Sequence, residues 1–122
     1  MTANRPFHYP AKNAPLQCGP IRMDALARKF GTPLYVYSGD EVLNRLQMFS
    51  TAFAGREHLV CYSVKANSSL AILKLLDERG AGFDIVSGGE LERVLKVSRE
   101  AATAQMAFCG PHLACSRKNC AL

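Results

Sequence analysis

Residues 59–67 read Leu-Val-Cys-Tyr-Ser-Val-Lys-Ala-Asn, and this stretch decides the fold. Its first six residues form a nearly unbroken apolar run of types that favour strands. A run of this kind is typical of a strand that is buried on both faces in a parallel sheet. We therefore predict a strand from Leu59 to Val64, with Lys65 at its carboxyl end.

Helices and strands alternate on both sides of this strand. Each predicted helix has apolar residues at helical spacing and a glycine stop or a Ser-x-x-Glu capping box, and each predicted strand is rich in apolar or β-branched residues. The predicted elements are helix 21–30, strand 32–38, helix 38–53, strand 59–64, helix 68–79, strand 82–86, a helix opened by 87–90, and strand 105–109. Alternation with short connections predicts right-handed βαβ units and a parallel sheet.

Two architectures of the α/β class contain such units, the open doubly wound sheet and the (β/α)₈ barrel. A doubly wound sheet usually carries a Gly-x-Gly-x-x-Gly motif after an early strand, and this motif does not occur in the sequence. The barrel is therefore favoured. Because a complete barrel takes about 250 residues and this chain has 122, we expect the N-terminal portion of a TIM-like barrel, incomplete.

Three ranges follow from this interpretation. Residues 1–20 contain four of the six prolines and no periodic apolar pattern, so we expect an irregular lead-in. Residues 21–110 form the partial barrel domain. Residues 111–122 break the pattern and are predicted to be a disordered tail.

Composition is that of an ordinary soluble globular protein, with 48% hydrophobic and 20% charged residues. No apolar run is long enough to span a membrane and the N-terminus lacks the apolar core of a signal peptide, so we expect a cytoplasmic protein. The fifteen Lys and Arg residues are scattered despite the net charge of +5, which argues against nucleic-acid binding. The odd number of cysteines favours reduced thiols. They are Cys18, Cys61, Cys109, Cys115 and Cys120.

Lys65 is the first candidate for chemistry, because barrel enzymes place their reactive groups at the carboxyl ends of the strands. A lysine that is partly desolvated there has a pKa below about 10.4, which leaves more free amine to attack an aldehyde. The alternative interpretation is a lysine whose ammonium group simply extends into solvent.

Two carboxylates follow Lys65. Asp84 interrupts the apolar run Phe83–Val86, and a carboxylate inside a sheet needs a cation or a hydrogen-bond donor as partner. It could instead lie at a strand end and face solvent. Glu90 is explained by its place in the Ser87–Glu90 capping box, although the same helix start could face the site.

The sequence Tyr62-Ser-Val-Lys-Ala-Asn67 resembles the lysine motif of the pyridoxal-phosphate-dependent barrel decarboxylases of the alanine racemase type. Phe83-Asp-Ile-Val-Ser-Gly-Gly-Glu90 resembles the second motif of that family, at its usual separation. Within the family, residues 8–12 and 30–38 are most similar to the diaminopimelate decarboxylases. The resemblance runs from about His8 to Val97, and its last similar residues are Phe108 to Gly110.

This resemblance implies a pyridoxal 5'-phosphate cofactor, with Lys65 as the catalytic residue that holds it as a Schiff base and assists proton transfer. It implies that Asp84 and Glu90 are cofactor-side carboxylates that position the Lys65 amine. It further implies removal of CO₂ from meso-diaminopimelate to give L-lysine, a small amino acid substrate, and homodimers. Decarboxylation of ornithine, arginine or a related amino acid is the alternative.

After Gly110 the sequence departs from the family pattern. The change suggests a truncated or frameshifted product, so a non-catalytic fragment is the competing interpretation, and we expect no decarboxylase activity from this chain alone. The tail also offers four soft ligands, Cys109, His112, Cys115 and Cys120. Their spacing matches no common zinc module, and a coincidental grouping is favoured over a metal site.

Overall fold

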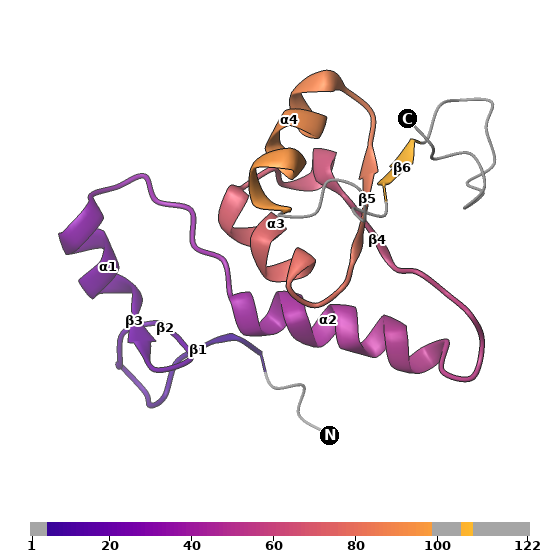
Figure 1. Cartoon of the computed structure of the whole chain (residues 1–122). Helices are drawn as coiled ribbons and strands as arrows, with labels where there is room; N and C mark the ends of the chain where they lie inside the picture. The colour runs from indigo at the N-terminus through magenta and orange to yellow at the C-terminus, as the bar shows by residue number, and fades with distance from the viewer. Residues whose placement is uncertain (1–4, 99–105, 109–122) are drawn as a thin grey trace. The chain divides into compact units, whose positions relative to one another are not determined.

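The computed structural model describes residues 5–98 and 106–108, and these fall into two compact units that meet in sequence between Glu41 and Val42. Figure 1 traces the chain through both units. The division lies inside helix α2, Gly39–Ala52. The domain ranges inferred from the sequence stay a prediction. Among the described residues, no helix is both long and apolar enough to cross a bilayer.

The first unit contains a small antiparallel sheet that the sequence pattern did not reveal. Its strands β1, β2 and β3 have two residues each and pair in chain order. They are Phe7–His8, Gln17–Cys18 and Ile21–Arg22. The expectation of an irregular lead-in was therefore wrong for residues 7–8 and 17–18, because two-residue strands are too short to produce a detectable periodicity.

Helix α1, Met23–Phe30, confirms the helix predicted at this place, although residues 21 and 22 belong to β3 instead. Gly31 ends the helix as expected. Its backbone has φ of 81°, a left-handed conformation that favours glycine, and its N–H donates to the Ala27 carbonyl oxygen at 2.8 Å.

The strand predicted over residues 32–38 is wrong. The structure has a loop there, and none of the described residues pairs with it. Its aromatic side chains are exposed, Tyr35 by 85% of its surface and Tyr37 by 56%. The β-forming residue types were correctly identified, but such residues make a strand only where a neighbouring strand supplies hydrogen bonds and packing.

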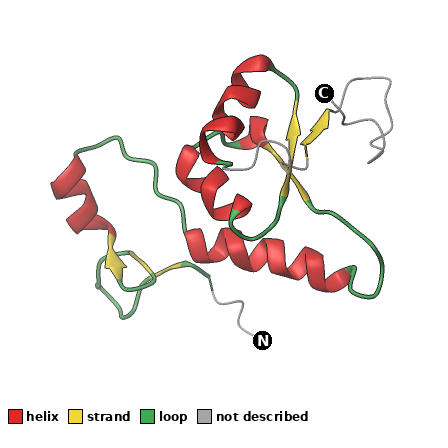
Figure 2. Ribbon diagram, in the orientation of Figure 1, coloured by secondary structure: helices red, strands yellow, loops and turns green. Residues whose placement is uncertain are grey.

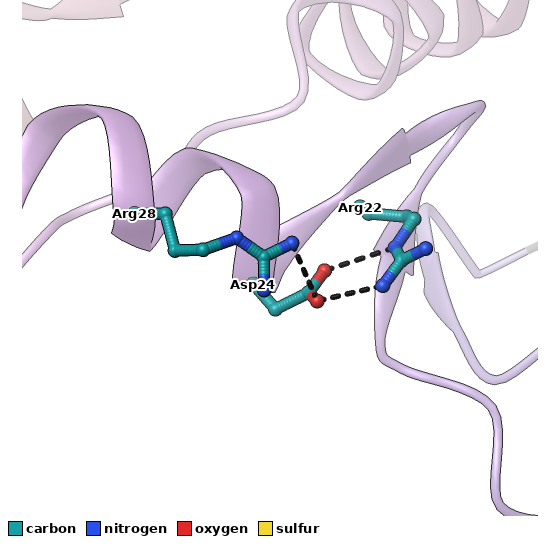
Figure 3. Close-up of polar contacts among 3 residues, drawn as sticks. All are labelled: Arg22, Asp24 and Arg28. Atoms are coloured by element: carbon teal, nitrogen blue, oxygen red, sulfur yellow. Dashed lines mark hydrogen bonds and ion pairs between the residues drawn. The ribbon is translucent and has the colours of Figure 1, made fainter.

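An ion-pair cluster joins the start of α1 to β3. The Arg22 guanidinium donates from Nε to Asp24 Oδ1 at 3.0 Å and from Nη2 to Asp24 Oδ2 at 2.7 Å. Arg28, one turn further along α1, places its Nη2 at 3.0 Å from the same Oδ2 (Figure 3). The Arg22 hydrogen bond is the main reason why the pKa of Asp24 falls from 3.8 to about 2.

We expect Arg22→Met to raise the pKa of Asp24 toward 3.8, and by more than Arg28→Met does, because the Arg22 hydrogen bond is the largest cause of the depression. Since the pKa is lower in the folded state, this cluster stabilises the fold fully above pH 3.8 and loses its contribution as the pH falls through about 2. NMR titration of the Asp24 side-chain carboxyl carbon measures the shift. A larger rise in the Arg28 variant would contradict this assignment.

The second unit is built on a parallel sheet of three strands, as predicted. The strand order is β4-β5-β6, and both pairs are parallel. The strands are β4 Cys61–Ser63, β5 Gly82–Ile85 and β6 Met106–Phe108. The order along the chain is strand, helix, strand, helix, strand (Figure 2). The parallel pairing of the β4 and β5 segments, expected from the short helical connection, is thereby confirmed.

Helices form where the apolar spacing and the caps predict them. Helix α2 begins after Ser38, whose Oγ accepts from the Glu41 N–H at 3.2 Å. Helix α4 begins after Ser87, whose Oγ accepts from the Glu90 N–H at 3.3 Å. Helix α3 is shorter than its predicted range of 68–79. The bounds of the last two helices are α3 Leu70–Asp77 and α4 Gly88–Val97.

The core of the second unit lies between the sheet and helices α3 and α4. It is made of apolar side chains from these elements, and Val42 and Leu46 of α2 pack against it. The fully buried residues with the largest side chains are Phe83, Leu73, Ile85, Val64 and Val94. Phe83 and Ile85 alternate with Asp84 along β5, so Asp84 lies on the opposite face of the strand.

Strand β4 differs from its prediction in length and burial. It covers only residues 61–63, and the next three residues form a 3₁₀ turn, η1, Val64–Ala66. The prediction that this strand is buried on both faces was also wrong, because Ser63 is exposed and Cys61 and Tyr62 are half-buried. The β5 prediction is better, since Gly82, Phe83 and Ile85 are all buried. In the described sheet β4 is an edge strand and β5 is central, which explains the contrast.

Candidate active site

Lys65 lies in the middle of turn η1, directly after β4. The residue before it, Val64, is fully buried in the core, and this fixes one side of the turn. Lys65 itself is exposed, so the expected partial desolvation of this lysine does not hold in the described part of the chain. The side chain is accessible at the carboxyl end of the sheet, where the sequence analysis expected it to be.

Asp84 lies at the corresponding place on the central strand. Its Cα is paired in register with Ser63, two residues before Lys65, and η1 lies against β5. Its Oδ1 atom is buried and has no hydrogen-bond partner among the described residues. A buried carboxylate oxygen without a donor is costly. The burial of this oxygen argues against a carboxylate that lies entirely in solvent, and a cationic or hydrogen-bonding partner for Asp84 stays a prediction.

The structure thus brings Lys65 and Asp84 to one end of the parallel sheet. Tyr62 pairs with Phe83, which faces the helices, so Ser63 and Asp84 share the other face of the sheet. In parallel sheets the carboxyl ends of the strands are where ligands bind. This end therefore offers an accessible amine and a buried carboxylate oxygen to which none of the described residues donates.

Glu90 lies in the first turn of α4, after the carboxyl end of β5. One of its carboxylate oxygens, Oε2, accepts a hydrogen bond from the Val86 N–H at 2.9 Å, and its own N–H is bonded to the Ser87 side chain. Glu90 therefore acts as a reciprocal cap, which explains it without a ligand. Its role beside a cofactor stays a prediction, as do those of Lys65 and Asp84.

The sequence analysis missed three side chains that hold the segment after Lys65. Tyr62, Asn67 and Arg93 each make a hydrogen bond with residues 67–69. Tyr62 and Asn67 belong to the quoted motif, which was the available signal. Nothing in the sequence indicates that Arg93, on a later helix, reaches this segment.

No group of three potential metal ligands occurs within residues 5–98 and 106–108. The tail ligands Cys109, His112, Cys115 and Cys120 lie outside the described residues. Cys18 and Cys61, the two cysteines among the described residues, are not joined in a disulfide.

The site suits an aldehyde cofactor whose attachment to an amine creates a positively charged or proton-donating group. Lys65 supplies the accessible amine. The buried Asp84 Oδ1 has no donor within the described part of the chain, and such a group would satisfy it. On these two observations the residues present fit pyridoxal phosphate.

Comparison with known proteins gives a consistent result. Residues 39–117 match the family model described as pyridoxal-dependent decarboxylase, pyridoxal binding domain. This range contains both quoted motifs. It also continues past Gly110, the last residue at which the resemblance was recognised from the sequence.

Curated relatives include diaminopimelate decarboxylases of two bacteria. The chain is 55% identical to that of Pseudomonas fluorescens over 75 residues, which is 62% of this chain and 18% of the relative. It is 51% identical to that of Neisseria meningitidis serogroup B over 87 residues, 71% of this chain and 21% of the relative. The chain therefore spans about a fifth of the length of these relatives.

Solved structures agree with the sequence relatives. The diaminopimelate decarboxylase of M. jannaschii, solved in complex with L-lysine, superimposes with a TM-score of 0.69 and 36% identity. The match covers 80% of this chain and 23% of that structure. A match to a decarboxylase barrel supports the predicted fold class, an incomplete α/β barrel. Because the family model covers about two thirds of its residues, the chain belongs to the pyridoxal-dependent decarboxylases and contains part of their pyridoxal-binding domain.

Proposed function

We propose that this chain carries the lysine-bearing part of the cofactor site of a diaminopimelate decarboxylase. The reaction would convert meso-diaminopimelate to L-lysine and CO₂. The observation that carries this proposal is the placement of Lys65 in an accessible turn beside strand β5, where Asp84 Oδ1 has no hydrogen-bond partner among the described residues.

The proposed roles follow from the chemistry of these side chains. When bound, pyridoxal phosphate supplies an electron-accepting ring that takes up the electrons released as CO₂ departs. Lys65 would anchor the cofactor through its amine and would later donate or accept a proton at its Nζ atom. Asp84 would hold that nitrogen in place by accepting a hydrogen bond at Oδ1, since this oxygen has no other donor among the described residues. Glu90 would keep the start of α4 fixed next to the site.

Support for the substrate comes from the relatives. The matched curated proteins are diaminopimelate decarboxylases, and the M. jannaschii enzyme was crystallised with L-lysine. A decarboxylase for ornithine or arginine is the second candidate, because the family model is shared by the wider group of pyridoxal-dependent decarboxylases. Assembly as a homodimer and a cytoplasmic location are parts of the same proposal.

The test is selective labelling of Lys65. The chain is incubated with pyridoxal phosphate and reduced with borohydride, and the labelled peptides are mapped by mass spectrometry. We expect label at Lys65 in clear excess over Lys74, which is ion-paired to Glu78 at 3.1 Å on helix α3. Lys65→Ala should remove the dominant label, and the control Lys74→Ala should leave it unchanged. Label spread evenly over the lysines would refute the site.

A further inference from the structure

The segment that follows Lys65 is held by side chains on two sides. The Tyr62 hydroxyl of β4 donates a hydrogen bond across the turn to the Asn67 carbonyl oxygen at 3.1 Å. The Asn67 side chain in turn accepts from the Ser69 N–H through Oδ1 at 3.0 Å. Together these two bonds close the chain around η1, so that the backbone on both sides of Lys65 is tied to β4.

A third bond comes from a distant part of the sequence. Arg93 on α4 donates from Nη1 to the Ser68 carbonyl oxygen at 3.2 Å, across a separation of 25 residues. Helices α3 and α4 are in contact, which brings Arg93 within reach of the residues that precede α3. A charged donor makes a stronger hydrogen bond than a neutral one.

Both side chains donate to backbone carbonyl oxygens of the segment that follows Lys65. Tyr62 and Arg93 bond to the carbonyl oxygens of two consecutive residues, Asn67 and Ser68, which lie in neither a helix nor a strand. Water could bond to these carbonyl groups on half-buried residues as well, so a long side chain from another element is not needed merely to supply them with a donor. What the side chains add is a fixed path for the backbone between Lys65 and α3.

We propose that Tyr62 and Arg93 are positioning residues for Lys65. They hold residues 67 and 68 in place from two elements, β4 and α4, and thereby fix the orientation of turn η1 next to β5. Neither residue touches the reacting atoms in this scheme. The inference rests on the proposed function for its purpose, but the ordering of the turn can be measured without any cofactor.

The experiment compares Tyr62→Phe and Arg93→Met in the full chain with two matched controls. Tyr37→Phe removes a hydroxyl from an exposed tyrosine, and Arg79→Met removes a guanidinium that has no hydrogen bond or ion pair with the described residues. Arg93→Lys serves as the conservative variant, because it retains one charged donor. It should recover part of what Arg93→Met loses.

The first readout is amide hydrogen exchange without cofactor. We expect the Ser69 amide, bonded to Asn67 Oδ1, to exchange about fivefold to tenfold faster in Tyr62→Phe and Arg93→Met. The Gly82 amide, bonded to the Val60 carbonyl oxygen, reports on the sheet and should not change. Equal acceleration at Ser69 and Gly82 would mean general destabilisation and would overturn the proposal, as would no change at Ser69.

The second readout separates positioning from simple reactivity. Labelling by pyridoxal phosphate and labelling by formaldehyde, each followed by reduction, are compared at Lys65 and Lys74 of the same molecule. Tyr62→Phe and Arg93→Met should each reduce the ratio of Lys65 labelling to Lys74 labelling about fivefold for pyridoxal phosphate. They should leave this ratio unchanged for formaldehyde, which needs no particular orientation of the lysine. An unchanged pyridoxal phosphate ratio in the variants would overturn the proposal. A wild-type chain without preference for Lys65 would instead refute the proposed function, and Ser69 exchange would still decide whether the turn is held.

Discussion

Replacement of Phe83 by alanine is expected to lower the free energy of unfolding of the second unit by about 3–5 kcal/mol. Phe83 is completely buried, lies on the central strand β5, and belongs to the core formed with α3 and α4. Its loss removes a large apolar surface and leaves a cavity that the surrounding side chains cannot fill completely. Domains are commonly stable by only 5–15 kcal/mol, so this single change should remove a large part of the total.

Denaturant unfolding followed by circular dichroism measures the effect. The matched control is Phe49→Ala on α2, because the Phe49 side chain is 58% exposed. It should change the free energy of unfolding by at most about 0.5 kcal/mol. Similar losses in the two variants would mean that β5 is not the centre of the core.

The arrangement of the second unit follows from local sequence signals that agree with one another. The apolar run before Lys65, the glycine stop at Gly80 and the cap at Ser87 each mark one boundary, and together they allow only short crossovers between parallel strands. Strand β5 was predicted to within one residue for this reason. Phe83 and Ile85 of this strand are buried in the core formed with α3 and α4, so burial and propensity act in the same direction.

Elements that depend on a partner were predicted poorly. The segment over residues 32–38 has strand-forming residues but no pairing partner among the described residues, and it remains a loop. Conversely, strands β1 to β3 form with only two residues each because they pair with one another. Pairing over a distance is a property of the folded chain, which a local pattern does not encode.

In the candidate site too, some features follow from local sequence and others depend on contacts between distant residues. That Lys65 and Asp84 would lie toward the same end of the sheet could be predicted, because parallel strands end at a common edge. The 3₁₀ turn around Lys65 lies against β5, and the Arg93 contact with Ser68 depends on how α4 packs beside α3, so neither could be predicted from local sequence. The exposure of Lys65 likewise depends on what surrounds the turn, and a sequence position alone does not specify this.

Replacement of Asp84 by leucine is expected to stabilise the fold and impair the site at the same time. The buried Oδ1 atom has no donor among the described residues, so its removal relieves a desolvation cost of about 1 kcal/mol. Leucine has the same branched shape as aspartate, with two methyl groups in place of the two carboxylate oxygens, so it introduces no polar atom that needs a partner. Groups that lower stability but serve a ligand are common at functional sites.

Two measurements on the same Asp84→Leu protein test this expectation. Its free energy of unfolding should rise by about 1 kcal/mol, while the Lys65 to Lys74 labelling ratio with pyridoxal phosphate should fall about tenfold, because the carboxylate no longer holds the lysine nitrogen. Asp84→Asn is the matched control. It keeps an oxygen acceptor without the charge, and it should reduce the ratio by less than leucine does. A leucine variant that is clearly less stable than the wild type would show that Asp84 has a structural partner. A leucine variant with an unchanged labelling ratio would remove Asp84 from the site and leave Lys65 to act without it.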